Sequence, residues 1–159
     1  MSAVIHPFHD PATGTVSYVV HDPATRAAAI IDPVLDYDPK SGRIGTDSLR
    51  VVQEYLAGAG LQVRRILETH AHADHLSSAQ VLRAATGAPV GIGDGIRQVQ
   101  AHFAEVFGID RDDPALRDAF DATFSDGDVI EAGALRLQVM ATPGHTSDSL
   151  AYVIDGHAF

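Results

Sequence analysis

The chain contains no cysteine. That absence excludes disulfides, cysteine-ligated zinc, iron–sulfur clusters and a cysteine nucleophile, so any bound metal has to use histidine, carboxylate or water ligands. No apolar run reaches the roughly 18 residues of a membrane span, and the segment MSAVIHPFHD lacks the charged start and apolar stretch of a signal peptide. These absences predict a cytoplasmic protein without a membrane partner.

Basic residues are also scarce. The chain has 11 lysines and arginines against 21 aspartates and glutamates, which gives a formal net charge of −10. Such an excess of negative charge argues against a nucleic-acid partner, because phosphates require a basic surface. Apolar residues make up 45% of the 159 residues, a composition typical of one globular domain or of part of a larger one.

Apolar runs and turn signals predict a layered α/β arrangement. We expect strands over residues 15–21, 27–31, 63–67, 90–92, 129–130, 135–140 and 150–154, with the start of another near His157. We expect helices over residues 48–59, 75–85 and 115–120, and another from Asp94 with Ile96, Val99, Phe103 and Phe107 on one apolar face. The polar stretch 37–45 is predicted to be a loop and residues 124–128 a turn.

The most informative segment is Thr69-His70-Ala71-His72-Ala73-Asp74-His75, which holds three imidazoles and a carboxylate. It joins a predicted strand to a predicted helix, and a turn at a strand end can aim several side chains at one point. In an extended segment His70, His72 and Asp74 point the same way, because side chains alternate. One ion can be held from the side of His70 and His72, and a second from Asp74 and His75.

A fourth histidine, distant in the sequence, belongs to the same metal-site hypothesis. His145 lies in the strand-end loop Thr142-Pro143-Gly144-His145-Thr146, which can bring it across the sheet to the same ion. Two histidines and a carboxylate with open positions suit non-haem Fe(II), whereas three histidines with water suit hydrolytic zinc. A solvated polar turn is the competing interpretation, and repulsion between protonated imidazoles makes it the less favourable one. The other histidines are interpreted as structural or solvated: His6, His9, His21, His102 and His157.

The motif His-x-His-x-Asp-His followed by Pro-Gly-His resembles the metallo-β-lactamase superfamily over nearly the whole chain. The flanking segments Ile31–Val34, Glu68–His75 and Thr142–Thr146 resemble its persulfide dioxygenase (sulfur dioxygenase) branch. The resemblance implies an αββα sandwich with the metal at one edge. Residues 1–159 would form the N-terminal portion of that domain, incomplete at the C-terminus, because the Gly-Asp pair that supplies the branch's carboxylate ligand after His145 is not found before Phe159.

The branch also implies a reaction. One Fe(II) per chain would be held by two histidines, matched here by His70 and His145, and by an aspartate. Glutathione persulfide and O₂ would react to give sulfite and glutathione. His72, Asp74 and His75 would then orient the ligands and tune the metal. A homodimer is compatible with the sequence.

Two alternatives to the dioxygenase stay open. The first is a hydrolase, because glyoxalase II hydrolases share the histidine motif. In a dinuclear Zn(II) hydrolase, His70, His72 and His145 would hold one ion, and Asp74 and His75 the other. Such a site would cleave a thioester with His72 and Asp74 as candidate catalytic residues, Asp74 helping to hold or deprotonate the water. The third possibility is a metal-binding fragment without activity.

Overall fold

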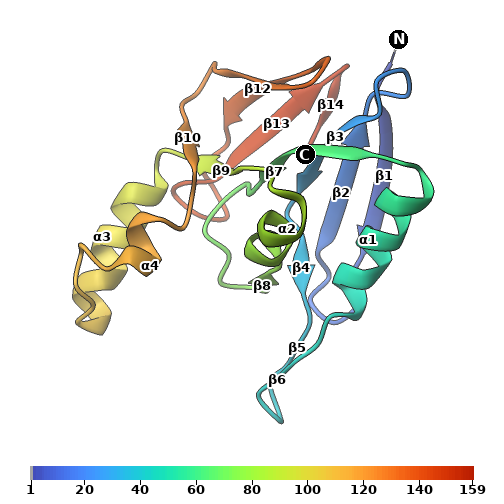
Figure 1. The fold of residues 1–159 in the computed structure, drawn as a ribbon. Coiled ribbons are helices and arrows are strands. Elements are labelled where there is room, and N and C mark those ends of the chain that lie inside the picture. Colours follow the sequence, from blue (N-terminus) through green and yellow to red (C-terminus); the bar gives the residue numbers. More distant parts are fainter. Residues whose placement is uncertain (1) are drawn as a thin grey trace.

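Two β-sheets face each other in this computed structural model, which describes residues 2–159 (Figure 1). The larger sheet has the strand order β1-β2-β3-β7-β9-β10, with β1 Val4–His9, β2 Val16–His21, β3 Ala27–Ile31, β7 Gln62–Leu67, β9 Val90–Gly93 and β10 Ala122–Phe124. The smaller sheet has the order β11-β12-β13-β14, with β11 Val129–Ala132, β12 Leu135–Ala141, β13 Leu150–Ile154 and β14 His157–Ala158.

Two short ladders and four helices complete the fold. The ladders pair β4 Val34–Leu35 with β8 Leu76–Ser77, and β5 Tyr37–Asp38 with β6 Arg43–Ile44. The helices are α1 Asp47–Gly58, α2 Ala79–Thr86, α3 Ile96–Phe107 and α4 Pro114–Arg117. None of the helices within residues 2–159 is both long and apolar enough to span a bilayer.

The alternation of side chains along β3 explains the layers. Ala29 and Ile31 pack between the two sheets, in a cluster that includes Leu137 and Tyr152 of the smaller sheet. Ala28 and Ile30 point the other way, into a second cluster with α1 and α2. Because both faces of β3 are covered, the strand is apolar throughout, as is typical of a buried central strand. The three layers, helices on one side of two facing sheets, correspond to the first three layers of the predicted αββα sandwich.

Strands β3, β7, β9 and β10 run parallel, so their carboxyl ends meet at one edge of the larger sheet. The backbone N–H of Asp32, directly after β3, donates to the carbonyl of Leu67 at the end of β7. This bond places the segment Glu68–His75, called the histidine loop below, beside Asp32.

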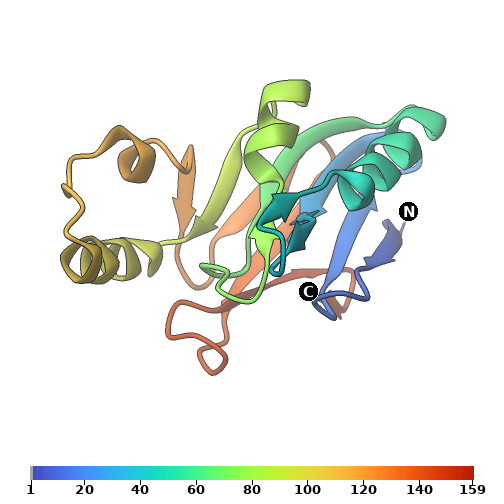
Figure 2. The same ribbon diagram turned by 90° about the horizontal axis from the view of Figure 1, so that it is seen from below.

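Helices α3 and α4 stand out at one end of the molecule (Figures 1 and 2). Ile96 and Ala104 of α3 are buried, but Phe103 and Phe107 are exposed and stack on each other with ring centroids 5.7 Å apart. The apolar face predicted for this helix is therefore buried only in part.

The strands predicted at β2, β3, β7, β9, β11, β12 and β13 and the helix predicted at α1 are confirmed. Other elements differ from the predictions. Strands β1 and β10 were not predicted, Phe124 lies in β10 and not in a turn, and α4 ends at Arg117 and not at residue 120. The segment 37–45, predicted as a loop, contains the β5–β6 hairpin, in which Tyr37 pairs with Ile44.

The helix predicted to open at His75 begins only at Ala79. Leu76 and Ser77 form strand β8 instead, paired with Leu35 and Val34, and the N–H of Ser78 donates to the carbonyl of Pro33. These contacts to a distant segment hold residues 76–78 extended, so the local helical pattern is overridden until α2.

Candidate metal centre

The histidine loop is fixed to the end of β3 by Asp32. Its Oδ1 accepts the backbone N–H of Thr69 at 2.7 Å, and its Oδ2 accepts the Thr69 hydroxyl at 2.7 Å. Asp32 itself has a φ of 47°, a left-handed conformation that costs energy for a residue with a side chain. A strained backbone at a strand end is typical of functional sites, where surrounding contacts hold it in place.

The loop after β12 is tied to the same place by two bonds. The N–H of Leu150 donates to the carbonyl of Thr69 at 3.0 Å, and the N–H of Ala71 donates to Asp148 Oδ2 at 3.0 Å. The ring of His145 consequently lies 4.8 Å from the ring of His70, centroid to centroid.

Of the five residues proposed as metal ligands, His70, His72, Asp74 and His75 cluster at this edge, and the exposed His145 approaches them beside the ring of His70. The ring centroids of His70 and His72 are 4.2 Å apart, and those of His72 and His75 are 4.1 Å apart. Asp74 Oδ1 lies 3.8 Å from His70 Nε2, 3.7 Å from His72 Nδ1 and 3.5 Å from His75 Nδ1. Sequence spacing therefore identified a real cluster of donor groups.

The donor atoms fit a divalent ion. Three buried ring nitrogens, His70 Nε2, His72 Nδ1 and His75 Nε2, have no hydrogen-bond partner within residues 2–159. Ligand atoms of His70, His72 and Asp74 lie within 4.8 Å of one another. Metal–ligand bonds of about 2.1 Å would place two ligands of one ion roughly 3.0–3.4 Å apart, so a small inward movement completes the coordination.

His72 is held from behind by two carboxylates. Its Nε2 lies 2.8 Å from Glu68 Oε2 and 3.1 Å from Asp32 Oδ1, which leaves Nδ1 as the nitrogen that faces Asp74. Asp32, Glu68 and His72 also form a compact acidic group, but Thr69 and Ser77 already donate to its carboxylates. We interpret this group as support for His72, because a carboxylate behind a ligating histidine fixes its orientation.

Burial and charge shift the pKa values of this network. Burial lowers the pKa of His72, but its hydrogen bonds and ion pairs with Asp32 and Glu68 outweigh that and raise it to about 10. Burial raises the pKa of Glu68 to about 7. Burial also raises the pKa of Asp32, but the bond from His72 more than compensates, so the net pKa is lowered. Coordination through His72 Nδ1 therefore displaces a proton from a stabilised imidazolium.

His70 and His75 behave differently. Burial lowers the pKa of both imidazoles, with the neighbouring charge of His72 adding to the effect. They are therefore neutral at physiological pH, which is the form that binds a metal.

Three supporting residues were not identified as part of the site from the sequence. Asp32 and Glu68 belong to the segments that flank the motifs, and Asp148 lies three residues after His145. Asp148 is buried and acts on the other loop, through Ala71. A polar residue directly after a buried strand is a signal that applies to Asp32, but nothing local in the sequence relates Asp148 to a residue 77 positions away.

The remaining histidines lie outside the cluster. His21 is buried with its Nε2 3.2 Å from the Tyr55 hydroxyl, and His6 stacks on the Tyr55 ring at 4.1 Å. His102 is exposed on α3. These placements agree with a structural or solvated role.

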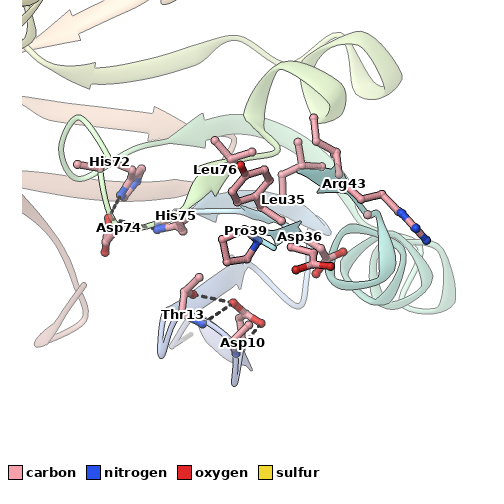
Figure 3. Close-up of a pocket in the computed structure, with 16 residues that line it drawn as sticks. Asp10, Thr13, Leu35, Asp36, Pro39, Arg43, His72, Asp74, His75 and Leu76 are labelled. Atoms are coloured by element: carbon pink, nitrogen blue, oxygen red, sulfur yellow. Dashed lines mark hydrogen bonds and ion pairs between the residues drawn. The ribbon is translucent and has the colours of Figure 1, made fainter. Parts of the chain in front are cut away.

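A cavity of about 960 Å³ opens beside the cluster (Figure 3). His72, Asp74 and His75 lie at one end of it, and residues of the β5–β6 hairpin line the other. Asp74 is the most accessible of the motif's acidic and imidazole groups, with 43% of its side chain exposed, whereas the side chain of His75 is 1% exposed. A ligand in the cavity would therefore meet Asp74 first.

A family model for the metallo-beta-lactamase superfamily matches residues 10–157. The chain belongs to the metallo-β-lactamase superfamily. Members of this superfamily bind divalent metals, in keeping with the His70, His72 and Asp74 donor group. The predicted fold is confirmed with it.

Individual relatives of this superfamily domain carry different names. A beta-lactamase hydrolase-like protein from Xylella fastidiosa is 44% identical over 155 residues, 96% of this chain and 35% of that protein. Human mitochondrial persulfide dioxygenase ETHE1 is 26% identical over 149 residues, 94% of this chain and 47% of that protein. The crystal structure of ETHE1 from Myxococcus xanthus matches with a TM-score of 0.70 at 28% identity, covering 95% of this chain and 53% of the other.

The chain thus spans between 35% and 53% of the length of these relatives. The superfamily expected from the sequence is confirmed. The persulfide dioxygenase branch is represented by distant relatives, while a relative with 44% identity bears the broader name of a hydrolase-like protein.

Proposed function

We propose that this domain serves a non-haem Fe(II) persulfide dioxygenase that oxidises glutathione persulfide with O₂. The observation that carries the proposal is the donor set: two imidazoles and one carboxylate, from His70, His72 and Asp74, lie within 4.8 Å of one another. Such a set leaves positions open for substrate and O₂ and is typical of non-haem Fe(II) oxygenases. His145 lies beside the His70 ring and adds a further imidazole from the loop after β12.

Asp74 is the carboxylate of this donor set. Its Oδ1 already faces nitrogens of His70, His72 and His75. The similarity to human persulfide dioxygenase and to the Myxococcus ETHE1 structure supports the same reaction.

The reaction balances without a further reductant. Glutathione persulfide, O₂ and one water give glutathione, sulfite and two protons; the S–S bond breaks and the outer sulfur is oxidised while O₂ is reduced. Bound Fe(II) supplies the redox chemistry that activates O₂. The chain positions the donors: Asp32 and Glu68 fix His72, and Asp148 fixes the backbone between His70 and His72.

A metal-dependent thioester hydrolase is the second candidate. The observation in its favour is the buried Nε2 of His75, which has no hydrogen-bond partner within residues 2–159 and is a further donor for a second ion. The name of the Xylella relative supports hydrolysis as well. Two Zn(II) ions per chain would activate a water for attack on the thioester carbonyl.

The two candidates are separated by measuring both reactions on one preparation loaded with either metal. We expect the Fe(II)-loaded protein to consume O₂ and form sulfite from glutathione persulfide in equal amounts, and the Zn(II)-loaded protein to do neither. The His70→Ala variant should lose the reaction, and His102→Ala, on the exposed face of α3, should retain it. Thioester cleavage by the zinc form, without O₂ uptake by the iron form, would refute the dioxygenase in favour of the hydrolase.

A further inference from the structure

The β5–β6 hairpin forms the end of the cavity that lies away from the histidines. Figure 3 places Asp36 and Arg43 at that end, away from His72 and Asp74, with Pro39 between the two groups. The volume of about 960 Å³ is in the range of pockets that take a small-molecule ligand. A molecule that reacts at the metal cluster therefore has room to extend as far as the hairpin.

Arg43 is the one arginine or lysine side chain lining this cavity within residues 2–159, among four aspartates: Asp10, Asp36, Asp38 and Asp74. The first two are already engaged, Asp10 with Thr13 and Asp36 with Ser48. The Arg43 guanidinium makes no hydrogen bond or ion pair within the described part of the chain, although arginines elsewhere, such as Arg50 and Arg83, are paired.

Asp38 stands directly opposite Arg43 across the hairpin, where the two residues are register partners. Its carboxylate accepts the N–H of Lys40 at 3.0 Å and the hydroxyl of Ser41 at 2.7 Å, bonds that lower its pKa and keep it ionised. A carboxylate can accept about four hydrogen bonds, so capacity remains. The hairpin thus presents a guanidinium and a carboxylate side by side without joining them.

Exposed apolar side chains line the same cavity. Tyr37, Ile44 and Leu76 are exposed, and all three line the cavity. A ligand that lies along these three side chains would bury its own methylene groups and would shield the side chains from water.

We propose that the hairpin binds the α-amino acid end of the substrate, with Arg43 pairing with its carboxylate and Asp38 with its ammonium. An α-amino acid group carries both charges on one carbon and so matches adjacent opposite charges on the protein. The γ-glutamyl end of glutathione is such a group, joined by a short methylene chain to the rest of the molecule. The inference rests on the proposed function, because it takes the reacting sulfur to lie at the His70–Asp74 cluster.

The test compares two thiols that share the cysteinyl-glycine unit. Binding of glutathione and of cysteinylglycine, which lacks the γ-glutamyl group, is measured by calorimetry on metal-loaded protein. We expect Arg43→Ala to weaken glutathione binding on the order of tenfold and to leave cysteinylglycine binding unchanged. Arg43→Lys should restore part of the loss, and Arg136→Ala, an exposed arginine outside the cavity, should bind both thiols like the wild type.

Equal glutathione affinity in Arg43→Ala and the wild type would overturn the inference, and so would an equal loss for both thiols. O₂ uptake with glutathione persulfide on the same samples keeps the two proposals apart. Arg43-dependent glutathione binding without O₂ uptake would refute the dioxygenase and retain the hairpin subsite. O₂ uptake together with glutathione binding that does not depend on Arg43 would retain the dioxygenase and refute the hairpin subsite.

Discussion

Tyr152 joins the smaller sheet to the residue that begins the histidine loop. The side chain is 0% exposed, and its hydroxyl donates to the carbonyl oxygen of Glu68 at 2.8 Å. Burial raises the pKa of Tyr152 well above its usual value, so the hydroxyl stays protonated and remains a donor. Replacement by phenylalanine keeps the ring in the core and removes this one bond.

The expected cost follows from what the substitution leaves behind. The Glu68 carbonyl has no other hydrogen-bond partner within residues 2–159. Leaving a buried acceptor unsatisfied costs about 1–3 kcal/mol. We therefore expect Tyr152→Phe to lower the free energy of unfolding by about 2 kcal/mol, which for a domain of this size lowers Tm by roughly 4–8 °C.

Urea denaturation of the metal-free protein measures this difference, with an unchanged dependence on urea concentration as evidence of the same folded state. Tyr18→Phe is the matched control: its ring is half-buried against Phe159, and its hydroxyl makes no hydrogen bond within the described residues. We expect that control to stay within about 0.5 kcal/mol of the wild type. A Tyr152→Phe variant as stable as Tyr18→Phe would refute the reasoning.

Three further substitutions test the packing and the loop contacts. Gly133 has a φ of +66°, and Gly133→Ala would place a Cβ 2.4 Å from the Cβ of Ala27. Gly127 has a similar φ of +86° but open space around it, so Gly127→Ala is the control. Calorimetry should show a larger loss of stability for Gly133→Ala than for Gly127→Ala. Leu137→Ala should lower the free energy of unfolding by about 2–5 kcal/mol in a denaturation experiment, because Leu137 is fully buried between the sheets. Met140→Ala, on the exposed face, should lower it much less. Similar losses for the two variants would contradict a core between the two sheets. Asp148→Ala releases the N–H of Ala71 and should weaken divalent metal binding at least about tenfold in a competition titration, while the exposed Asp112→Ala should not; unchanged affinity would remove Asp148 from the positioning network.

Central elements were predictable because their signals are local. Strands β3 and β7 are short apolar runs, and α1 buries Leu49, Val52 and Leu56 at helical spacing. The five candidate ligands lie in two short motifs, so the sequence alone was enough to predict that they belong to one metal site. The structure adds how the two loops meet, which depends on Leu150 bonding to Thr69.

The errors arose where distant contacts decide the conformation. Strand β1 contains Pro7 and two histidines, a weak strand pattern, but it lies at the edge of the sheet, where proline is tolerated. Residues 76–78 follow a helical pattern and are nevertheless held extended by Val34 and Leu35. Asp32 reaches His72 across 40 positions of sequence, and no short pattern encodes such a pair.

The central claim is that the His70–His75 loop and His145 hold a divalent metal. Anaerobic titration with Fe(II), followed by elemental analysis after removal of free ions, tests it on the wild type, His70→Ala and His102→Ala. We predict about one tightly held iron per chain in the wild type and in His102→Ala, and none in His70→Ala. Iron retained equally by all three proteins, or by none of them, would contradict the account.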